Sequence, residues 1–268
     1  MKILRSSISD TFSVLKNNKS LFLRNAVKRI VQDSDKVCLR RILNMLDRLE
    51  IKFTFFIVGF LAETYPDFIK EIAHRGHEIA SHGYVHRAYG NMSPQEIEDD
   101  LRKSIQAFNS LGIDIMGIRP PYLSHHGKLD SIADKLGFQY NSGSVAFEFC
   151  LYENVFSGAH AAESSPAPLQ LPITQLSDYD LIEYKKLSIE DAIEYWKKES
   201  TGQGTYLFHS RIIGSDRHYN LMEDFFRYLK DEFRLVTMNE KASGKSGIAL
   251  TMDIGVLNKR DLFHLLLN

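Results

Sequence analysis

The stretch KFTFFIVG, from Lys52 to Gly59, is the part of the sequence that decides the fold. After Lys52, aromatic and β-branched residues follow one another without a polar residue larger than threonine, and a glycine ends the run. A short run of this kind predicts a β-strand that is buried on both faces. Strands buried on both faces are typical of parallel sheets covered by helices, so this stretch predicts an α/β protein.

Segments of strand length and helix length alternate outward from this strand. A helix is predicted over residues 62–76 and a strand over 77–81. The clearest helix covers residues 93–112, because Ser93 is an N-cap, Pro94 stands at the first helical position and Glu96 completes a capping box. Further strands are predicted at 115–120, 138–143, 204–210, 234–238 and 247–252, with helices at 127–137, 188–200, 220–233 and 258–268. This alternation is typical of βα units around a parallel sheet or barrel.

The bulk composition excludes several classes of protein. Lysine and arginine number 33 against 34 acidic residues, so the net charge of -1 gives no broad attraction to nucleic acid or to an anionic membrane. The two cysteines, Cys38 and Cys150, form no CxxC motif, which argues against a disulfide framework or a thiolate zinc site. We see no apolar run of membrane-spanning length, and residues 1–22 do not have the apolar stretch and cleavage site expected of a secretion leader. We therefore expect a cytoplasmic protein of one large domain, and the sequence is compatible with an oligomer.

Two histidines follow the strand predicted at 77–81. In the stretch GHEIASHGYVH, residues 76–86, His82 and His86 lie in the turn that leaves the strand. Two neutral imidazoles within one turn can bind one metal ion, usually zinc. An isolated pair with this spacing is more often hydrogen-bonded or exposed, so other strand ends have to support the interpretation.

Two other predicted strands also end in polar residues. Arg119 follows the strand at 115–120, where two prolines fix the next turn, and His209 ends the apolar run YLFHS. Alone, Arg119 would be read as a surface ion pair and His209 as a core histidine. Functional residues gather at the carboxyl ends of parallel strands, so their shared position favours a common site.

The blocks TFFIVG, GHEIASHGYVH, RPPY and YLFHS, in this order over residues 39–238, resemble the polysaccharide deacetylase family, also called the NodB-homology or carbohydrate esterase family 4 group. The resemblance implies a distorted (β/α) barrel that removes acetyl or formyl groups from amino sugars with an Asp-His-His metal centre. It implies metal ligation by His82 and His86, orientation of the catalytic carboxylate by Arg119 and proton donation by His209. It also implies an acyl pocket lined by Leu207, and Tyr122 is a further candidate for the cleft. On this basis we divide the chain into a lead-in (1–38), a deacetylase-like barrel (39–238) and a strand-helix tail packing on the barrel (239–268).

The family's first motif, TFDDG, supplies the catalytic base and the metal aspartate, and it is not present as such before TFFIVG. Asp10 would preserve the family's chain order, and the pair Asp33 and Asp35 lies at about the usual distance but after a helical segment. Asp253 in GIALTMDIGV stands where the first aspartate belongs, with Ile254 in place of the second. Plain helix or turn caps are the alternative for each. We keep Asp10 and Asp253 as candidate catalytic acids and Asp10 as the candidate third metal ligand.

The segment SDYDLIEY, residues 177–184, offers Asp178 and Asp180, either of which could orient His209. An exposed loop is the alternative. Together these features predict a metal-dependent hydrolase, with zinc as the expected metal, that removes an N-acyl group from an amino sugar or glycan. Two alternatives stay open: another C–N hydrolase acting on a small cyclic amide or imide, and an inactive carbohydrate-binding homologue, which the incomplete first motif would explain.

Overall fold

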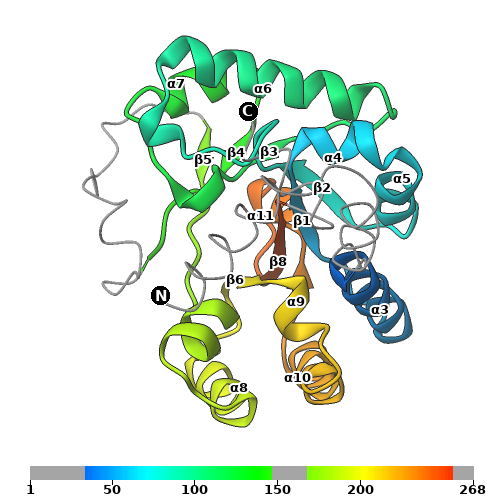
Figure 1. The fold of residues 1–268 in the computed structure, drawn as a ribbon. Coiled ribbons are helices and arrows are strands. Elements are labelled where there is room, and N and C mark those ends of the chain that lie inside the picture. Colours follow the sequence, from blue (N-terminus) through cyan, green and yellow to red (C-terminus); the bar gives the residue numbers. More distant parts are fainter. Residues whose placement is uncertain (1–33, 147–167, 256–268) are drawn as a thin grey trace, which may run out of the picture.

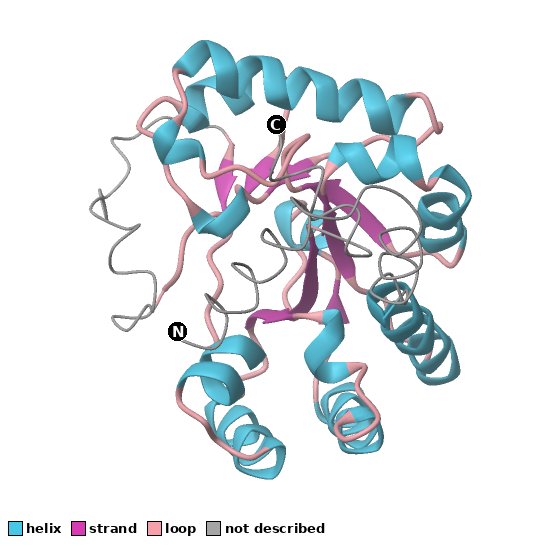
Figure 2. Ribbon diagram, in the orientation of Figure 1, coloured by secondary structure: helices cyan, strands magenta, loops and turns pink. Residues whose placement is uncertain are grey.

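The computed structural model describes residues 34–146 and 168–255. Within these ranges eight strands form one parallel sheet in the order β5-β4-β3-β2-β1-β8-β6, and β7 also pairs with β8. Figures 1 and 2 show this sheet curved at the centre of the molecule. The strands are β1 (Thr54–Ile57), β2 (Glu78–Ser81), β3 (Gly117–Ile118), β4 (Tyr140–Asn141), β5 (Leu169–Gln170), β6 (Gly204–Phe208), β7 (Leu235–Val236) and β8 (Ile248–Ile254).

Helices surround the outside of the curved sheet, except for α11 (Met238–Ala242), which lies within the ring of strands (Figure 1). The outer helices are α3 (Ser34–Leu49), α4 (Gly59–Thr64), α5 (Pro66–His74), α6 (Pro94–Asn109), α7 (Leu129–Lys135), α8 (Ile189–Glu199), α9 (Ser210–Ile213) and α10 (Tyr219–Glu232), with short turns η1 (Tyr89–Asn91), η2 (Pro121–Leu123) and η3 (Tyr179–Tyr184). The curve closes after β5, where the backbone N–H of Thr174 donates to the carbonyl of Thr205 on β6. This architecture confirms the predicted distorted (β/α) barrel. None of the helices in the described ranges is long and apolar enough to cross a membrane.

The strands bury both of their faces, as the KFTFFIVG stretch predicts. All four residues of β1 are buried. Phe55 and Ile57 belong to the large core between sheet and helices, whereas Phe56 packs in a smaller cluster inside the barrel with Ala80 and Ala249. Because side chains alternate along a strand, the inner face is free to carry polar groups near the strand ends.

The predicted elements are confirmed except at one helix. The capping box of Ser93 and Glu96 is formed at the start of α6. The single helix predicted at 62–76 is wrong, because the structure breaks it at Tyr65 into α4 and α5. Pro66 lacks an N–H and starts α5 at the first helical position instead of continuing α4. The predicted helix at 258–268, as well as Cys150, Asp10 and Asp33, lies outside the described residues.

Strand β8 lies between β1 and β6, although it is the last described strand in the chain. Its register pairs Phe56 of β1 with Asp253, and Leu207 of β6 with Thr251. The 239–268 segment therefore contributes an interior strand of the barrel. This position brings Asp253 to the rim where β1, β2 and β6 end.

Candidate active site

Four strands bring the predicted polar residues to one rim. His82, Arg119 and His209 each follow directly after the last residue of β2, β3 and β6, and Asp253 is the penultimate residue of β8. All four strands are parallel, so their carboxyl ends meet at the same end of the barrel. The structure therefore brings His82, Arg119, His209 and Asp253 together at this rim. Asp10 is not among the described residues.

Arg119 forms the floor of this site. Its side chain is fully buried, and Nη1 donates to Asp253 Oδ1 at 2.8 Å and to Thr251 Oγ1 at 2.9 Å. Nη2 and Nε donate to the hydroxyl and carbonyl of Ser142, and the guanidinium lies 4.0 Å from the ring centroid of Phe56. These contacts use both sides of the guanidinium fork and fix its orientation.

The contact with Arg119 sets the charge of Asp253. Burial by itself raises the pKa of this carboxyl, but the charge and hydrogen bond of Arg119, together with the charges of His82 and His209, outweigh this effect and lower the pKa. One carboxylate oxygen is held by Arg119, and the other, Oδ2, lies 3.9 Å from His82 Nε2. Asp253 is thus ionised and oriented, with one oxygen directed to the histidines.

His82 and His86 are held as neutral imidazoles. Nδ1 of His82 lies 2.8 Å from the carbonyl oxygen of Arg119, which makes Nδ1 the donor and leaves a lone pair on Nε2. Burial lowers the pKa of His82, and it lowers that of His86 to about 3. The two ring centroids are 5.0 Å apart. A Cβ on Gly255 would stand 2.6 Å from His86 Cδ2, so glycine leaves the room that this ring occupies.

These two imidazoles fit a metal ion as ligands, but the set around them is incomplete. A backbone carbonyl that fixes the tautomer of a histidine is the arrangement found behind metal-binding histidines. No three histidine, cysteine, aspartate or glutamate side chains form a metal-binding group within residues 34–146 and 168–255. Ile254, where the family motif has its second aspartate, is buried in the large outer core. The described residues do not supply a third metal ligand. Asp10, which was predicted to be that ligand, lies outside them.

His209 is paired with Asp178 on the other side of the site. Nδ1 of His209 lies 2.6 Å from Asp178 Oδ1, and its backbone N–H donates to Asp178 Oδ2 at 2.7 Å. Burial lowers the pKa of His209, but the charge and hydrogen bond of Asp178, together with the charges of Asp253 and Asp180, outweigh this effect and raise the pKa above its ordinary value. Asp180 instead accepts hydrogen bonds from Ser177. Of the two candidates, Asp178 therefore orients His209, whose side chain is one-third exposed, 33%.

Asp100 is a positioning residue that sequence reasoning missed. It lies on α6, is 6% exposed, and accepts from the backbone N–H groups of Tyr84 and Val85 and from the hydroxyl of Tyr89. These bonds fix the turn that carries both histidines. An acidic residue on the apolar face of the predicted 93–112 helix was the signal that could have revealed it.

The remaining predicted residues line the rim. Leu207 is buried in a small apolar cluster with Leu123 and Ile173. The ring centroid of Tyr122 lies 4.4 Å from that of His86. Tyr122 and Leu123 both have positive φ, 58° and 53°, a conformation that is uncommon for bulky residues.

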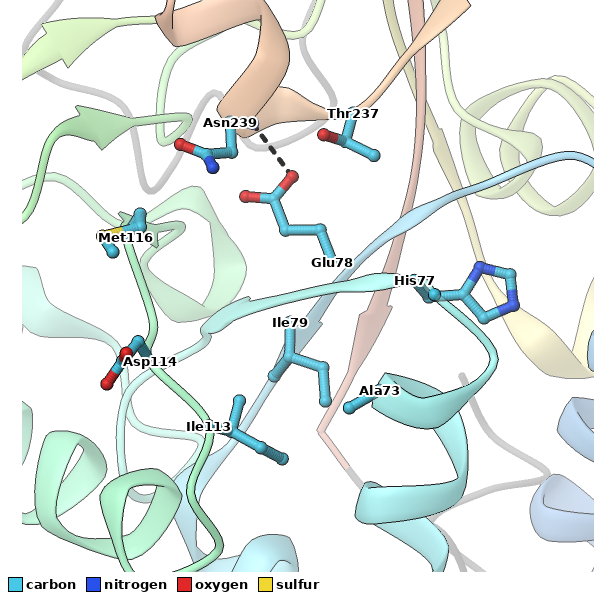
Figure 3. A pocket seen from close by; sticks show the side chains of 10 residues that line it. Ala73, His77, Glu78, Ile79, Ile113, Asp114, Met116, Thr237 and Asn239 are labelled. Carbon is cyan, nitrogen blue, oxygen red and sulfur yellow. Dashed lines mark hydrogen bonds between the residues drawn. The ribbon is translucent and has the colours of Figure 1, made fainter.

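A hollow of about 280 Å³ lies at the opposite end of the barrel, where β2 and β3 begin (Figure 3). Glu78 points into it, and its carboxylate accepts hydrogen bonds from Tyr140, Thr54 and the backbone of Asn239. Burial raises the pKa of Glu78. Both carboxylate oxygens of Glu78 already accept hydrogen bonds, and Glu78 lies at the end of β2 away from the rim. We therefore assign it a structural role, in which it links β1, β2, β4 and α11.

Comparison with known proteins agrees with this geometry. The polysaccharide deacetylase family model matches residues 30–141. A peptidoglycan deacetylase-like protein of Gibberella zeae is 33% identical over 156 residues, which cover 53% of this chain and 46% of that protein. A peptidoglycan-N-acetylglucosamine deacetylase of Bacillus cereus is 36% identical over 83 residues, 31% of this chain and 30% of that protein. The chain thus spans less than half of each of these relatives.

The fold also has a solved counterpart. The crystal structure of a putative polysaccharide deacetylase from Mycobacterium smegmatis superposes with a TM-score of 0.64 at 23% identity, covering 78% of this chain and 77% of that one. The region matched by the family model carries His82, His86 and Arg119, the same residues that the structure gathers at the rim. The motifs, the barrel and these matches together show that the chain resembles the polysaccharide deacetylase family, whose model matches residues 30–141.

Proposed function

We propose that this protein is a metal-dependent hydrolase that removes an N-acyl group, acetyl or formyl, from an amino sugar or glycan. The observation that carries the proposal is the meeting of two oriented pairs, Arg119 with Asp253 and His209 with Asp178, beside two neutral histidines. Hydrolysis of an amide needs a base for the water, an acid for the departing nitrogen and stabilisation of the carbonyl oxygen. The family relatives support the acyl chemistry, and their names support a glycan substrate.

Each of these residues has a defined task. Asp253, ionised and held through Oδ1 by Arg119, accepts a proton from water as the water oxygen adds to the acyl carbon. His209, protonated because of Asp178, gives its proton to the nitrogen as the C–N bond breaks. The products are the free amine and the short carboxylic acid. A divalent metal, for which zinc is our proposal, would be held by His82 and His86 and would act as the Lewis acid for the carbonyl oxygen.

The test combines metal content with acyl release for wild type and four variants. Wild type should carry about one equivalent of zinc. His82→Ala should lose both metal and turnover, whereas Asp253→Asn should keep the metal and lose about 100-fold or more in kcat. Asp10→Ala should lose the metal if Asp10 is the third ligand. His125→Ala, which changes an exposed histidine of the same rim region, is the control and should behave as wild type.

An inactive glycan-binding homologue is the second candidate, and Ile254 is the observation that favours it. A buried isoleucine replaces the second aspartate of the family motif, so the metal set of the described ranges is incomplete. This candidate becomes the better one if wild type binds no zinc after reconstitution and still binds glycan. Acyl release by a metal-free protein would contradict the metal-dependent mechanism.

A further inference from the structure

The first turn of helix α4 binds the histidine turn, residues 82–86. The backbone N–H of Gly59 donates to the carbonyl of Gly83 at 2.8 Å, and the N–H of Phe60 donates to the carbonyl of Tyr84 at 3.0 Å. The first N–H groups of a helix have no acceptor within that helix, so they can bind another segment. In α4 this segment is the one that carries both candidate metal ligands.

The residue just before α4 binds the strand of Asp253. The backbone N–H of Val58 donates to the carbonyl of Ile254 at 3.2 Å, and Ile254 directly follows Asp253 on β8. Three consecutive N–H groups, those of residues 58–60, therefore join the end of β8 to the histidine turn. We call these three residues the backbone bracket. It connects the proposed base to the proposed metal ligands through main-chain hydrogen bonds.

The bracket reaches the histidine turn because Gly59 has no side chain. A Cβ at this position would stand 2.9 Å from Ser104 Cα on α6 and 3.0 Å from Tyr84 Cδ2. Carbon atoms pack best at about 3.5–4.0 Å, so a larger residue would force α4 away from α6 and from the turn. The φ of Gly59 is not positive, so glycine is needed here for space and not for its backbone conformation.

Helix α6 cannot give way at this point without disturbing the histidine turn. Ser104 is fully buried, and its Oγ lies 2.8 Å from Ser81 Oγ. Ser81 also accepts a hydrogen bond from the backbone N–H of Gly83 at 3.1 Å. Asp100, one turn earlier on α6, accepts two further N–H groups of the histidine turn. The turn is thus held between α4, which binds its carbonyls, and α6, whose Asp100 binds its N–H groups.

We propose that Gly59 is a positioning residue of this site. It lets α4 approach closely enough for the backbone bracket to fix the histidine turn relative to Asp253. A side chain at residue 59 would break the hydrogen bonds to the carbonyls of Gly83 and Tyr84 and leave the turn held by α6 alone. The consequence for metal binding and acyl release rests on the proposed function, whereas the consequence for the turn itself does not.

The first measurement is hydrogen exchange of single amides by NMR on the wild-type full chain. Amides in the first turn of a helix exchange fast where they have no acceptor. The amides of Gly59 and Phe60 should exchange at least about 10-fold more slowly than those of Gln95 and Glu190, two exposed residues at the second positions of α6 and α8. Equal rates would overturn the inference, because the bracket would then not form in solution.

The second measurement compares Gly59→Ala with wild type. The amides of Tyr84 and Val85 should exchange at least about 10-fold faster in the variant, while those of β1 keep their rates. Gly214→Ala is the matched control, since a Cβ there would stand 2.9 Å from Cys38 Cβ, in the contact of α9 with α3. It should leave the histidine turn at its wild-type rates. The inference is also overturned if Gly59→Ala loosens the turn no more than Gly214→Ala does. The wild-type comparison decides if either variant fails to fold.

Zinc affinity and acyl release are measured on the same proteins. Gly59→Ala should bind zinc about tenfold more weakly, and it should lower kcat with little change in KM. Unchanged zinc binding, acyl release and amide exchange in Gly59→Ala would leave the proposed function standing and refute the inference. Slow exchange at the bracket and a loosened turn in Gly59→Ala, in a protein whose wild type binds no zinc and releases no acyl group, would support the positioning role and refute the proposed function.

Discussion

At the residue scale, the electrostatics of the site separate an acid from a base. Arg119 lowers the pKa of Asp253 against the effect of burial, and Asp178 raises the pKa of His209 against the effect of burial. Asp253 therefore keeps its negative charge to lower pH than an ordinary aspartate, and His209 keeps its proton to higher pH than an ordinary histidine. This division is what a reaction needs when it takes a proton from water and gives one to an amine.

Asp178→Asn should move the alkaline limb of the pH profile toward lower pH. Without the carboxylate, burial lowers the pKa of His209, so the imidazole loses its proton earlier as the pH rises. The loss in kcat/KM should therefore grow with pH, reaching about 100-fold at the alkaline end. Profiles of wild type and variant measure this. Asp180→Asn is the control and should shift the limb less, because Asp180 is only the weakest contributor to that pKa. An unchanged alkaline limb in Asp178→Asn would contradict the assignment.

The sequence predicted the histidines and the arginine of the site but not the choice among its aspartates. His82, His86, Arg119 and His209 stand in contiguous motifs next to predicted strands, so local pattern was enough. Asp178 and Asp180 are only two residues apart, at the start of the π-helix η3. The sequence does not show which of their side chains reaches His209. Asp10 and Asp253 could not be separated because strand pairing, which places Asp253, is a long-range contact.

At the element scale, helix α6 does more than cover the sheet. The local sequence was enough to predict its capping box, its apolar face and its ends to within a few residues. Its buried Asp100 ties the helix to the loop that carries His82 and His86. The break at Pro66, in contrast, was missed because the apolar periodicity continues across it from α4 to α5.

Asp100→Ala should both destabilise the protein and weaken its metal binding. The change leaves two backbone N–H groups and the Tyr89 hydroxyl without their acceptor, which should cost about 3 kcal/mol of unfolding free energy. A looser histidine turn should lower zinc affinity about 10-fold to 100-fold. Denaturant unfolding and zinc titration measure the two effects. Asp99→Ala, an exposed acid on the same helix, should change stability by less than about 0.5 kcal/mol. Equal effects of the two variants would refute the anchoring role.

At the scale of the whole molecule, the barrel is built in an order that the chain does not follow. Asp253, the proposed base, comes from β8, the last described strand, which pairs with β1, β6 and β7. Strands that pair in a parallel sheet need not be adjacent in the sequence. The composition of GIALTM therefore predicted a strand, but it could not predict which strands pair with it. The position of Asp253, the proposed base, thus depends on pairing between parts of the chain about 200 residues apart.

Hydrogen exchange should show that β8 belongs to the most stable part of the fold. Its backbone lies between β1 and β6, and its residues up to Met252 are buried, so its amides should exchange only through global unfolding, as slowly as those of β1. β5, at the edge of the sheet with Leu169 46% exposed, should exchange at least about 10-fold faster. Exchange followed by mass spectrometry on peptides covering 54–57, 169–170 and 248–254 makes the comparison. If β8 exchanged as fast as β5 while β1 stayed protected, Asp253 would sit on a strand that detaches from the barrel, and its role as a fixed base would fail.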